Sequence, residues 1–330
     1  MADITRDEVS LYDRQIRLWG LDGQRRLHEA NVLVVGFDAV TVEVVKNVVL
    51  AGVGALTIAD DNQVSETDLE YNFFVTAQDI GANRVEAGLV RVQRLNPRVA
   101  VTAHLHKPAD LHAEFLGQFD VVVTSGVPFD EMTRINAAVR DAGHAFYATG
   151  LFGWMGYIFA DLVEHTFTVE RPRPNAPTKL GRVSLTREVL DAHVDSANNE
   201  RLQIREVYAP LHIAVENAVK LPFASTLKPR ARARVTPYLP ALLASWETAT
   251  LATADVEAKA RALGLPATIV THEFVASFGA LEGVQISAVA AVVGGQLAQD
   301  MINYLTRREY PIQNIVIYDA KSGQGPMYVL

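Results

Sequence analysis

The feature of this sequence that most constrains its fold is a regular alternation, in the first half, between short apolar runs and longer helical patterns. The run Val32-Leu33-Val34-Val35 carries no polar residue, which is typical of a strand buried on both faces of a sheet. A helical pattern over residues 40–51 closes at Gly52, and a second apolar run follows at 55–59. The alternation continues through expected helices at 81–95 and 130–142 and expected strands at 99–105, 119–124 and 144–148. This order predicts an α/β fold with a doubly wound, mostly parallel sheet.

The N-terminal segment has a helical pattern of its own. Thr5 and Glu8 fit a capping box, in which each side chain satisfies a free N–H group at a helix start. We expect one helix over residues 6–19, ended by Gly20, and a second, shorter helix over 22–30.

The middle of the chain departs from the strand–helix alternation. Three prolines in residues 170–177 indicate a linker or mobile loop, and 183–262 is expected to form mainly helices and loops. The α/β character returns with an expected helix over 286–308 and strands at 312–318 and 325–330. The predicted division is a first α/β part at 1–165, a linker and mainly helical insertion at 166–262, and a returning α/β part at 263–330.

Composition excludes several classes of protein. The 330 residues contain no cysteine, so a thiol nucleophile, a disulfide and a cysteine-ligated metal are excluded in this chain. The net charge is −8, whereas nucleic-acid binders usually carry a basic surplus. The most apolar stretch, 286–298, is too short to span a bilayer. We therefore expect no nucleic-acid, membrane or metal partner.

The loop after the first apolar run bears on nucleotide binding. A dinucleotide fingerprint G-x-G-x-x-G would fall at residues 36–41, but only Gly36 matches it. Asp38 would bring a carboxylate towards phosphate oxygens, and Thr41 fills space that a close backbone approach needs. Asp60 stands where a ribose-binding carboxylate would stand. From these residues the loop can be a structural turn or a degenerate phosphate site, and the former is favoured.

A more specific signal comes from the run Tyr12-Asp13-Arg14-Gln15-Ile16-Arg17-Leu18-Trp19-Gly20. It resembles the N-terminal signature of ubiquitin-like protein activating enzymes, which are related to the bacterial MoeB and ThiF adenylyltransferases. Residues 32–36, 51–54, 95–97 and 119–120 agree in order. Two later segments, 156–162 and 291–300, are similar to the small subunits of heterodimeric SUMO-activating enzymes. The resemblance covers about residues 10–165 and 284–330.

This resemblance also shows what the chain lacks. Catalytic members hold MgATP with a glycine-rich loop, an Asp, an Asn-x-x-Arg-Gln element, a Lys and a later Asp. Tyr71 replaces the arginine, Arg84 the lysine, and Val127 the later aspartate, which removes an oxygen ligand that Mg²⁺ needs. The resemblance therefore implies a catalytically silent chain that binds no cofactor alone, with MgATP and the thioester cysteine in a large partner subunit.

One catalytic contribution is still implied. The resemblance maps Arg14 onto an arginine that reaches across the subunit interface to the ATP phosphates in the partner's site. A guanidinium suits this role because it offers a fixed fork of donors and a permanent charge. Arg17, Trp19, Gly294 and Gly295 are assigned to the partner interface, although Trp19 could equally be a core residue.

The expected partners are the large catalytic subunit and SUMO, and the family implies residence in the nucleus, with the cytoplasm as a second location. The basic cluster at 228–234 is either an import signal or a solvated segment. Three alternatives remain open. They are a NAD-dependent oxidoreductase with a degenerate fingerprint, a self-sufficient MoeB-like homodimer, and a subunit acting on another ubiquitin-like modifier.

Overall fold

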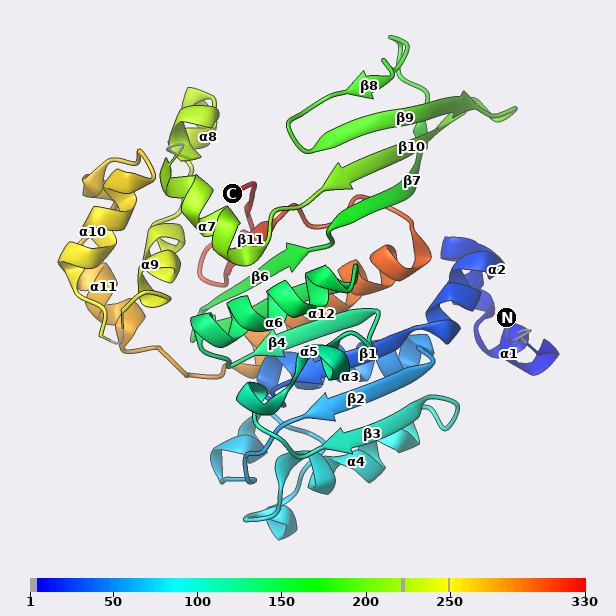
Figure 1. The fold of residues 1–330 in the computed structure, drawn as a ribbon, viewed down its shortest axis with the longest axis horizontal. Coiled ribbons are helices and arrows are strands. Elements are labelled where there is room, and N and C mark those ends of the chain that lie inside the picture. The colour runs from blue at the N-terminus through cyan, green and yellow to red at the C-terminus, as the bar shows by residue number, and fades with distance from the viewer. Residues whose placement is uncertain (1–4, 221–222, 249) are drawn as a thin grey trace.

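An eight-stranded sheet forms the centre of the molecule (Figure 1). The computed structural model describes residues 5–220, 223–248 and 250–330. The strands of this sheet are β1 (Asn31–Val35), β2 (Ala55–Ala59), β3 (Ala100–His104), β4 (Val121–Ser125), β5 (Ala145–Phe152), β6 (Met155–Asp161), β11 (Ile315–Asp319) and β12 (Met327–Tyr328). They lie in the order β12-β11-β6-β5-β4-β1-β2-β3, and the five strands from β5 to β3 are parallel. The predicted mostly parallel sheet is thus confirmed.

Helices cover both faces of this sheet, which is why its central strands are mainly apolar. Alternate residues of β1 divide between two cores, with Val32 and Val34 in one and Leu33 and Val35 in the other. The first core contains α3 (Ala39–Ala51), α4 (Arg84–Leu95) and α12 (Ser287–Thr306). The second contains α5 (Ala113–Leu116), α6 (Phe129–Asp141) and α7 (Leu211–Lys220).

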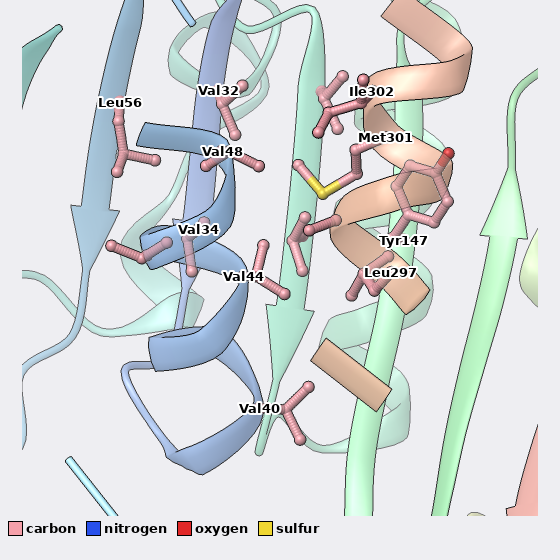
Figure 2. Packing of buried hydrophobic residues seen from close by; sticks show 14 of the residues in the cluster. Val32, Val34, Val40, Val44, Val48, Leu56, Tyr147, Leu297, Met301 and Ile302 are labelled. Carbon is pink, nitrogen blue, oxygen red and sulfur yellow. The ribbon is translucent and has the colours of Figure 1, made fainter. Parts of the chain in front are cut away.

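Helix α3 packs on the sheet beside α12, which also contacts the sheet. Figure 2 shows the packed cluster that results, with the sulfur of Met301 at its centre. The labelled members are Val40, Val44 and Val48 of α3, Leu297, Met301 and Ile302 of α12, and Val32, Val34, Leu56 and Tyr147 of the strands. This cluster joins a late segment of the chain to an early one, as expected for a returning α/β part.

The N-terminal segment forms α1 (Arg6–Leu11) and α2 (Asp13–Glu29). The predicted capping box is confirmed, since the Glu8 carboxylate accepts from the N–H of Thr5 at 2.8 Å and Thr5 Oγ1 accepts from the N–H of Glu8 at 3.3 Å. A single helix over 6–19 was wrong, because the chain leaves helical geometry at Tyr12. The predicted break at Gly20 is present as a kink inside α2, with φ 78° and ψ 167°.

A second, four-stranded antiparallel sheet corrects the expectation of helices and loops after residue 183. Its strands are β7 (Glu164–Pro172), β8 (Gly181–Arg182), β9 (Arg187–Val194) and β10 (Asn199–Val207), in the order β7-β10-β9-β8. Only five buried residues form its core: Phe167, Val169, Val189, Leu202 and Ile204. Polar and charged residues stand between them on β7, β9 and β10, so the apolar signal is weak.

The rest of the middle region is helical, as expected. After α7 come α8 (Pro229–Arg232), α9 (Tyr238–Ser245), α10 (Thr253–Ala262) and α11 (His272–Gly279), and α9 to α11 form the yellow lobe of Figure 1. Short 3-10 turns lie at Thr67–Glu70, Ala77–Asp79, Pro108–Asp110, Phe223–Thr226 and Ala267–Ile269. The predicted domain boundaries at 165 and 262 stay predictions; parts of the predicted segments, namely 1–4, 221–222 and 249, lie outside the described residues. Within the described chain, no helix is long and apolar enough to cross a bilayer.

Candidate functional site

The loop after β1 turns sharply at Gly36, the first position of the fingerprint. Its φ is +88°, and a Cβ there would stand 2.3 Å from the carbonyl oxygen of Ser125 at the end of β4. L side chains rarely adopt this backbone conformation, so the position requires glycine. The turn alone accounts for this glycine.

The first turn of α3, where a phosphate group would bind, is occupied by the side chain of Asp38. Its Oδ1 accepts hydrogen bonds from the N–H groups of Val40 at 3.1 Å and Thr41 at 3.2 Å. The hydroxyl of Ser125 donates to its Oδ2 at 2.6 Å, and Thr41 Oγ1 accepts from the N–H of Asp38 at 2.9 Å. Helices bind phosphate through such N–H groups. Here the protein's own carboxylate satisfies them.

The carboxylate of Asp60, at the ribose-binding position, is also committed to partners within the chain. Its Oδ2 accepts from the N–H of Phe37 at 2.8 Å, and its Oδ1 accepts from the N–H of Asn62 at 2.8 Å. The Nη1 atom of Arg84 lies 3.2 Å from Oδ2. Arg84, at the position of the family's lysine, therefore neutralises a buried acid of its own chain.

Arg84 also pairs with Asp68, a residue that the sequence analysis did not single out. The Nε of Arg84 lies 2.9 Å from Oδ1 of Asp68, and the hydroxyl of Tyr71 donates to the same oxygen at 2.6 Å. Burial acts to raise the pKa of Asp68, but hydrogen bonds from Tyr71 and Ser65 and the charge of Arg84 outweigh it, so this pKa is lowered. Burial and the bond to Asp68 raise the pKa of Tyr71. The substituted positions 71 and 84 thus form one internal network.

Neither Asp68 nor Ser125 was predicted to belong to this site. The spacing of Ser65 and Asp68 matches a capping pattern, and the N–H and hydroxyl of Ser65 both donate to Asp68 at 2.7 Å. That pattern could have located Asp68. Nothing in the local sequence indicates that Ser125 contacts Asp38, because the contact joins the ends of two different strands.

Five predicted residues meet around a cavity of about 110 Å³: Gly36, Asp38, Asp60, Arg84 and Val127. Small-molecule sites usually have volumes of roughly 300–1,000 Å³, so this cavity alone cannot contain a nucleotide. Val127 brings an apolar side chain to the wall, as its expected replacement of a carboxylate implies. Among the described residues, no group of three or more His, Asp or Glu is placed to hold a metal ion.

A larger cavity of about 540 Å³ adjoins the first and shares Asp38 and Val127 with it. Three more carboxylates line it, namely Asp130, Glu247 and Glu282. No lysine or arginine belongs to its described lining. A triphosphate placed there would face four acidic side chains without a counter-charge. The two cavities together do not fit MgATP.

The opposite edge of the sheet, where β1 begins, presents the N-terminal signature. Tyr12 is buried, and its hydroxyl oxygen accepts a hydrogen bond from Nδ2 of Asn96 at 2.7 Å. A Cβ on Gly52 would stand 2.5 Å from that oxygen, so the glycine leaves room for the tyrosine. Tyr12 thus fixes the start of α2 against the ends of α3 and α4.

Arg14 lies in the first turn of α2, two residues after this anchor. It is exposed, and within the described part of the chain its side chain makes no hydrogen bond or ion pair. Arg17 is also exposed, but its Nε lies 3.1 Å from a carboxylate oxygen of Asp13. Because α2 leads into the start of β1 whereas Asp38 follows its end, α2 and the nucleotide loop lie at opposite edges of the sheet (Figure 1). Tyr12 holds the start of α2, and with it the turn that contains Arg14, at the edge away from the loop.

The structure places two of the four predicted interface residues inside the chain. Trp19 belongs to the first core, and its Nε1 donates to Gln24 at 3.0 Å. Gly294 packs α12 against α3, since a Cβ there would lie 2.7 Å from both Glu43 Cβ and the carbonyl oxygen of Val40. Close packing within the chain therefore accounts for both residues. Gly295 faces open space, and Arg17 faces solvent.

A mostly parallel sheet with a tight glycine turn after β1, extended by antiparallel strands, defines a doubly wound α/β protein. The ThiF family matches residues 12–329, and the chain belongs to this family. Two solved structures show the same fold at low identity. A crystal structure of PaaA gives a TM-score of 0.59 with 12% identity and covers 100% of this chain and 77% of that one. Escherichia coli MccB gives 0.54 and 13%, over 97% and 71%.

Full-length relatives narrow the position of the chain within the family. It is 31% identical to SUMO-activating enzyme subunit 1 of Homo sapiens, over 98% of this chain and 95% of that protein. It is 32% identical to the DNA damage tolerance protein RHC31 of Saccharomyces cerevisiae, over 98% and 97%. The predicted resemblance to the small subunits of SUMO-activating enzymes is therefore confirmed along the whole sequence.

Proposed function

We propose that this chain is the catalytically silent subunit of a SUMO-activating heterodimer, and that it completes the ATP site of the large subunit with Arg14. Full-length similarity to SUMO-activating enzyme subunit 1 supports the assignment to such a complex. The absence of cysteine requires the thioester to form on the partner.

The Asp38 side chain, which occupies the phosphate-binding position of the nucleotide loop, supports catalytic silence. The N–H groups at the start of α3 already bind Asp38, and the larger adjoining cavity is lined by four carboxylates. Displacing Asp38 would leave a charged carboxylate without its hydrogen bonds while bringing it close to phosphate oxygens. MgATP therefore binds in the large subunit, and this chain alone binds little or none.

The single observation that carries the proposal is the guanidinium of Arg14 on an anchored helix, which has no partner among the described residues. Arg14 lies at the edge away from this chain's own loop, so its charge can act on another molecule. In the proposed complex, the SUMO C-terminal carboxylate attacks the α-phosphorus of ATP and the bond to pyrophosphate breaks. Arg14 stabilises the negative charge that develops on the leaving pyrophosphate.

The test is ATP–pyrophosphate exchange by the purified chain mixed with its candidate large subunit, SUMO and MgATP. Arg14→Ala is expected to lower the exchange rate by about a hundredfold while the heterodimer still assembles in gel filtration. Arg94→Ala is the control, because Arg94 is an exposed arginine on α4 to which no interface role is assigned. It is expected to change the rate less than about twofold.

Two outcomes would overturn parts of the proposal. If Arg14→Ala assembles and exchanges like the wild type, Arg14 is structural and the chain acts only as a scaffold. If the isolated chain exchanges pyrophosphate, the claim of a silent site is wrong and a self-sufficient MoeB-like enzyme is favoured.

Membership of the ThiF family and the carboxylate at position 38 remove the support for a NAD-dependent oxidoreductase. Action on another ubiquitin-like modifier is tested in the same assay by replacing SUMO with that modifier. Nuclear residence stays a prediction from the family, to be checked by imaging the tagged full-length chain.

A further inference from the structure

A pocket of about 310 Å³ lies between α2, the small antiparallel sheet and the C-terminal end of α12. The kink of α2 provides Trp19 and Gly20, and four arginines surround the space: Arg26, Arg201, Arg307 and Arg308. It lies apart from the cavities around Asp38 and shares no lining residue with them. Nothing in the proposed function uses it.

The walls of this pocket are held in place by hydrogen bonds between the elements. Arg26 donates from Nε to the carbonyl oxygen of Leu305 at 3.2 Å and from Nη2 to that of Thr306 at 2.5 Å. The N–H of Thr168 on β7 donates to the carbonyl oxygen of Arg307 at 3.0 Å. These hydrogen bonds hold Arg26 and the backbone of Arg307 in fixed positions at the pocket.

The positive charge in the pocket is only partly balanced. Glu170 pairs with Arg308 at 3.0 Å and with Arg201 at 3.8 Å, so one carboxylate serves two guanidinium groups. Asp22 lines the pocket but pairs with Arg25 at 3.3 Å. Within the described chain, Arg307 has no ion-pair partner, and Arg26 bonds only carbonyl oxygens. Burial and the neighbouring charge of Arg307 lower the pKa of Arg26.

Neutral hydrogen-bonding groups point to the same kind of ligand. Thr166, Thr168 and Gln203 line the pocket, and their side-chain polar atoms make no hydrogen bond to any other described residue. An adjoining cavity of about 500 Å³ shares Arg26, Thr166 and Arg307 with this pocket, and it contains His165. His165 is 4% exposed, and its Nε2 has no partner among the described residues.

We propose that this pocket is a binding site for a doubly charged oxyanion of the phosphate class. Guanidinium forks and hydroxyl donors around one small space match the tetrahedral array of acceptor oxygens that such a group presents. The acidic side chains of the adjoining cavity, Glu29, Asp120 and Glu164, confine the anion to the arginine end. The anion is either a free phosphate compound or a phosphorylated side chain of a protein partner.

The test is calorimetric titration of the full chain, at fixed ionic strength, with inorganic phosphate, with pyrophosphate and with a neutral peptide carrying one phosphoserine. The test variant is Arg201→Gln with Arg307→Asn, because asparagine tolerates the left-handed backbone of position 307 (φ 57°). The control is Arg230→Gln with Arg234→Gln, which removes the same charge from exposed positions of the helical region. Arg26 is left intact because its bonds hold α12 in place.

We expect at least about a tenfold loss of affinity in the test variant and less than about a twofold loss in the control. Tighter binding of the phosphopeptide than of phosphate would identify a modified protein segment as the source, and equal or weaker binding would identify a small anion. An equal loss in both variants would reduce the effect to net charge and overturn the site. Absence of saturable binding to all three probes at millimolar concentration would also overturn it.

Discussion

The two edges of the central sheet use charged residues in opposite ways. Where β1 and β4 end, Asp38, Asp60 and Arg84 are each paired within the chain, and we call this the sealed edge. Where β1 begins, Arg14 stands exposed and unpaired among the described residues, and we call this the open edge. At the sealed edge, the N–H groups at the start of α3 that could bind a phosphate instead bind a carboxylate of the same chain.

This difference has an energetic consequence. Buried charges and caps contribute to folding stability, and removing one partner leaves the other without compensation. An exposed, unpaired arginine contributes almost nothing to stability. Substitutions at the sealed edge should therefore destabilise the isolated chain, whereas those at the open edge should leave it unchanged.

The largest expected effect is that of Arg84→Leu. This change leaves Asp60 and Asp68 buried without their cation, and we expect the free energy of unfolding to fall by about 3–5 kcal/mol in urea titrations. Arg94→Leu, at an exposed position of the same helix, should change it by less than about 0.5 kcal/mol. Equal effects of the two substitutions would remove the distinction between the edges.

The same network predicts a loss of stability in acid. The folded-state pKa of Asp68 is lowered, so the folded chain releases this proton more readily than the unfolded chain. The stabilisation is complete above the unfolded pKa and is lost as the pH falls through the folded pKa. Asp68→Asn should flatten the dependence of the urea midpoint on pH below about pH 4, whereas the exposed control Asp141→Asn should not.

An intermediate effect is expected from Gly294→Ala, where α12 meets the first turns of α3. The added Cβ meets backbone and Cβ atoms at 2.7 Å, so we expect a cost of about 1–3 kcal/mol in the isolated chain. Gly295→Ala, which meets no atom, should stabilise the helix by up to about 1 kcal/mol. If Gly294→Ala instead leaves the isolated chain unchanged and weakens only the heterodimer, the predicted role at the partner interface is restored.

A smaller effect is expected at the cap itself. Asp38→Ala frees the N–H groups of Val40 and Thr41 and should cost about 1–2 kcal/mol. Asp38→Asn keeps an acceptor for these groups, so its cost should be smaller. Urea denaturation of the isolated chain measures the cost of each substitution. An alanine variant as stable as the wild type would show that the carboxylate does not act as a cap.

The smallest effect is expected at the open edge. Arg14→Ala and Arg17→Ala should each change the free energy of unfolding of the isolated chain by less than about 0.5 kcal/mol. Thermal melts of the two variants beside the wild type provide the measurement. A clear loss in Arg14→Ala would mean that this arginine has a structural role within its own chain.

The predictable parts of the fold are those with a strong local signal. The strands β1, β2 and β4 are short runs rich in apolar residues, and Gly52 marks the end of α3, so these elements follow from residue order alone. The small sheet is not predicted because polar and charged residues separate the apolar ones along its strands. Its core consists of five buried side chains, which give a weak apolar pattern. Tyr12 interrupts the first helix for a distant reason, its bond to Asn96, which no local pattern encodes.

The candidate site was predictable in composition but not in arrangement. Positions 38, 41, 71, 84 and 127 are identified by their departure from the expected pattern and positions 36 and 60 by their agreement with it, and the structure shows what most of these side chains do. The bond between Asp38 and Ser125 joins two strands that are far apart in sequence. The interface role of Gly294 stays a prediction, because a small residue on a helix fits an internal contact and a subunit contact equally well, and the structure shows the internal one.

The packing of α12 on α3 also governs when the molecule can fold. Most of the sequence separates these two helices. The apolar face of α3 that contacts α12 therefore stays uncovered until the C-terminal region has left the ribosome. Contacts of such long sequence separation slow folding, and a nascent chain with an uncovered valine-rich helix is prone to aggregation. Truncation before residue 287 should therefore yield insoluble protein rather than a smaller soluble domain.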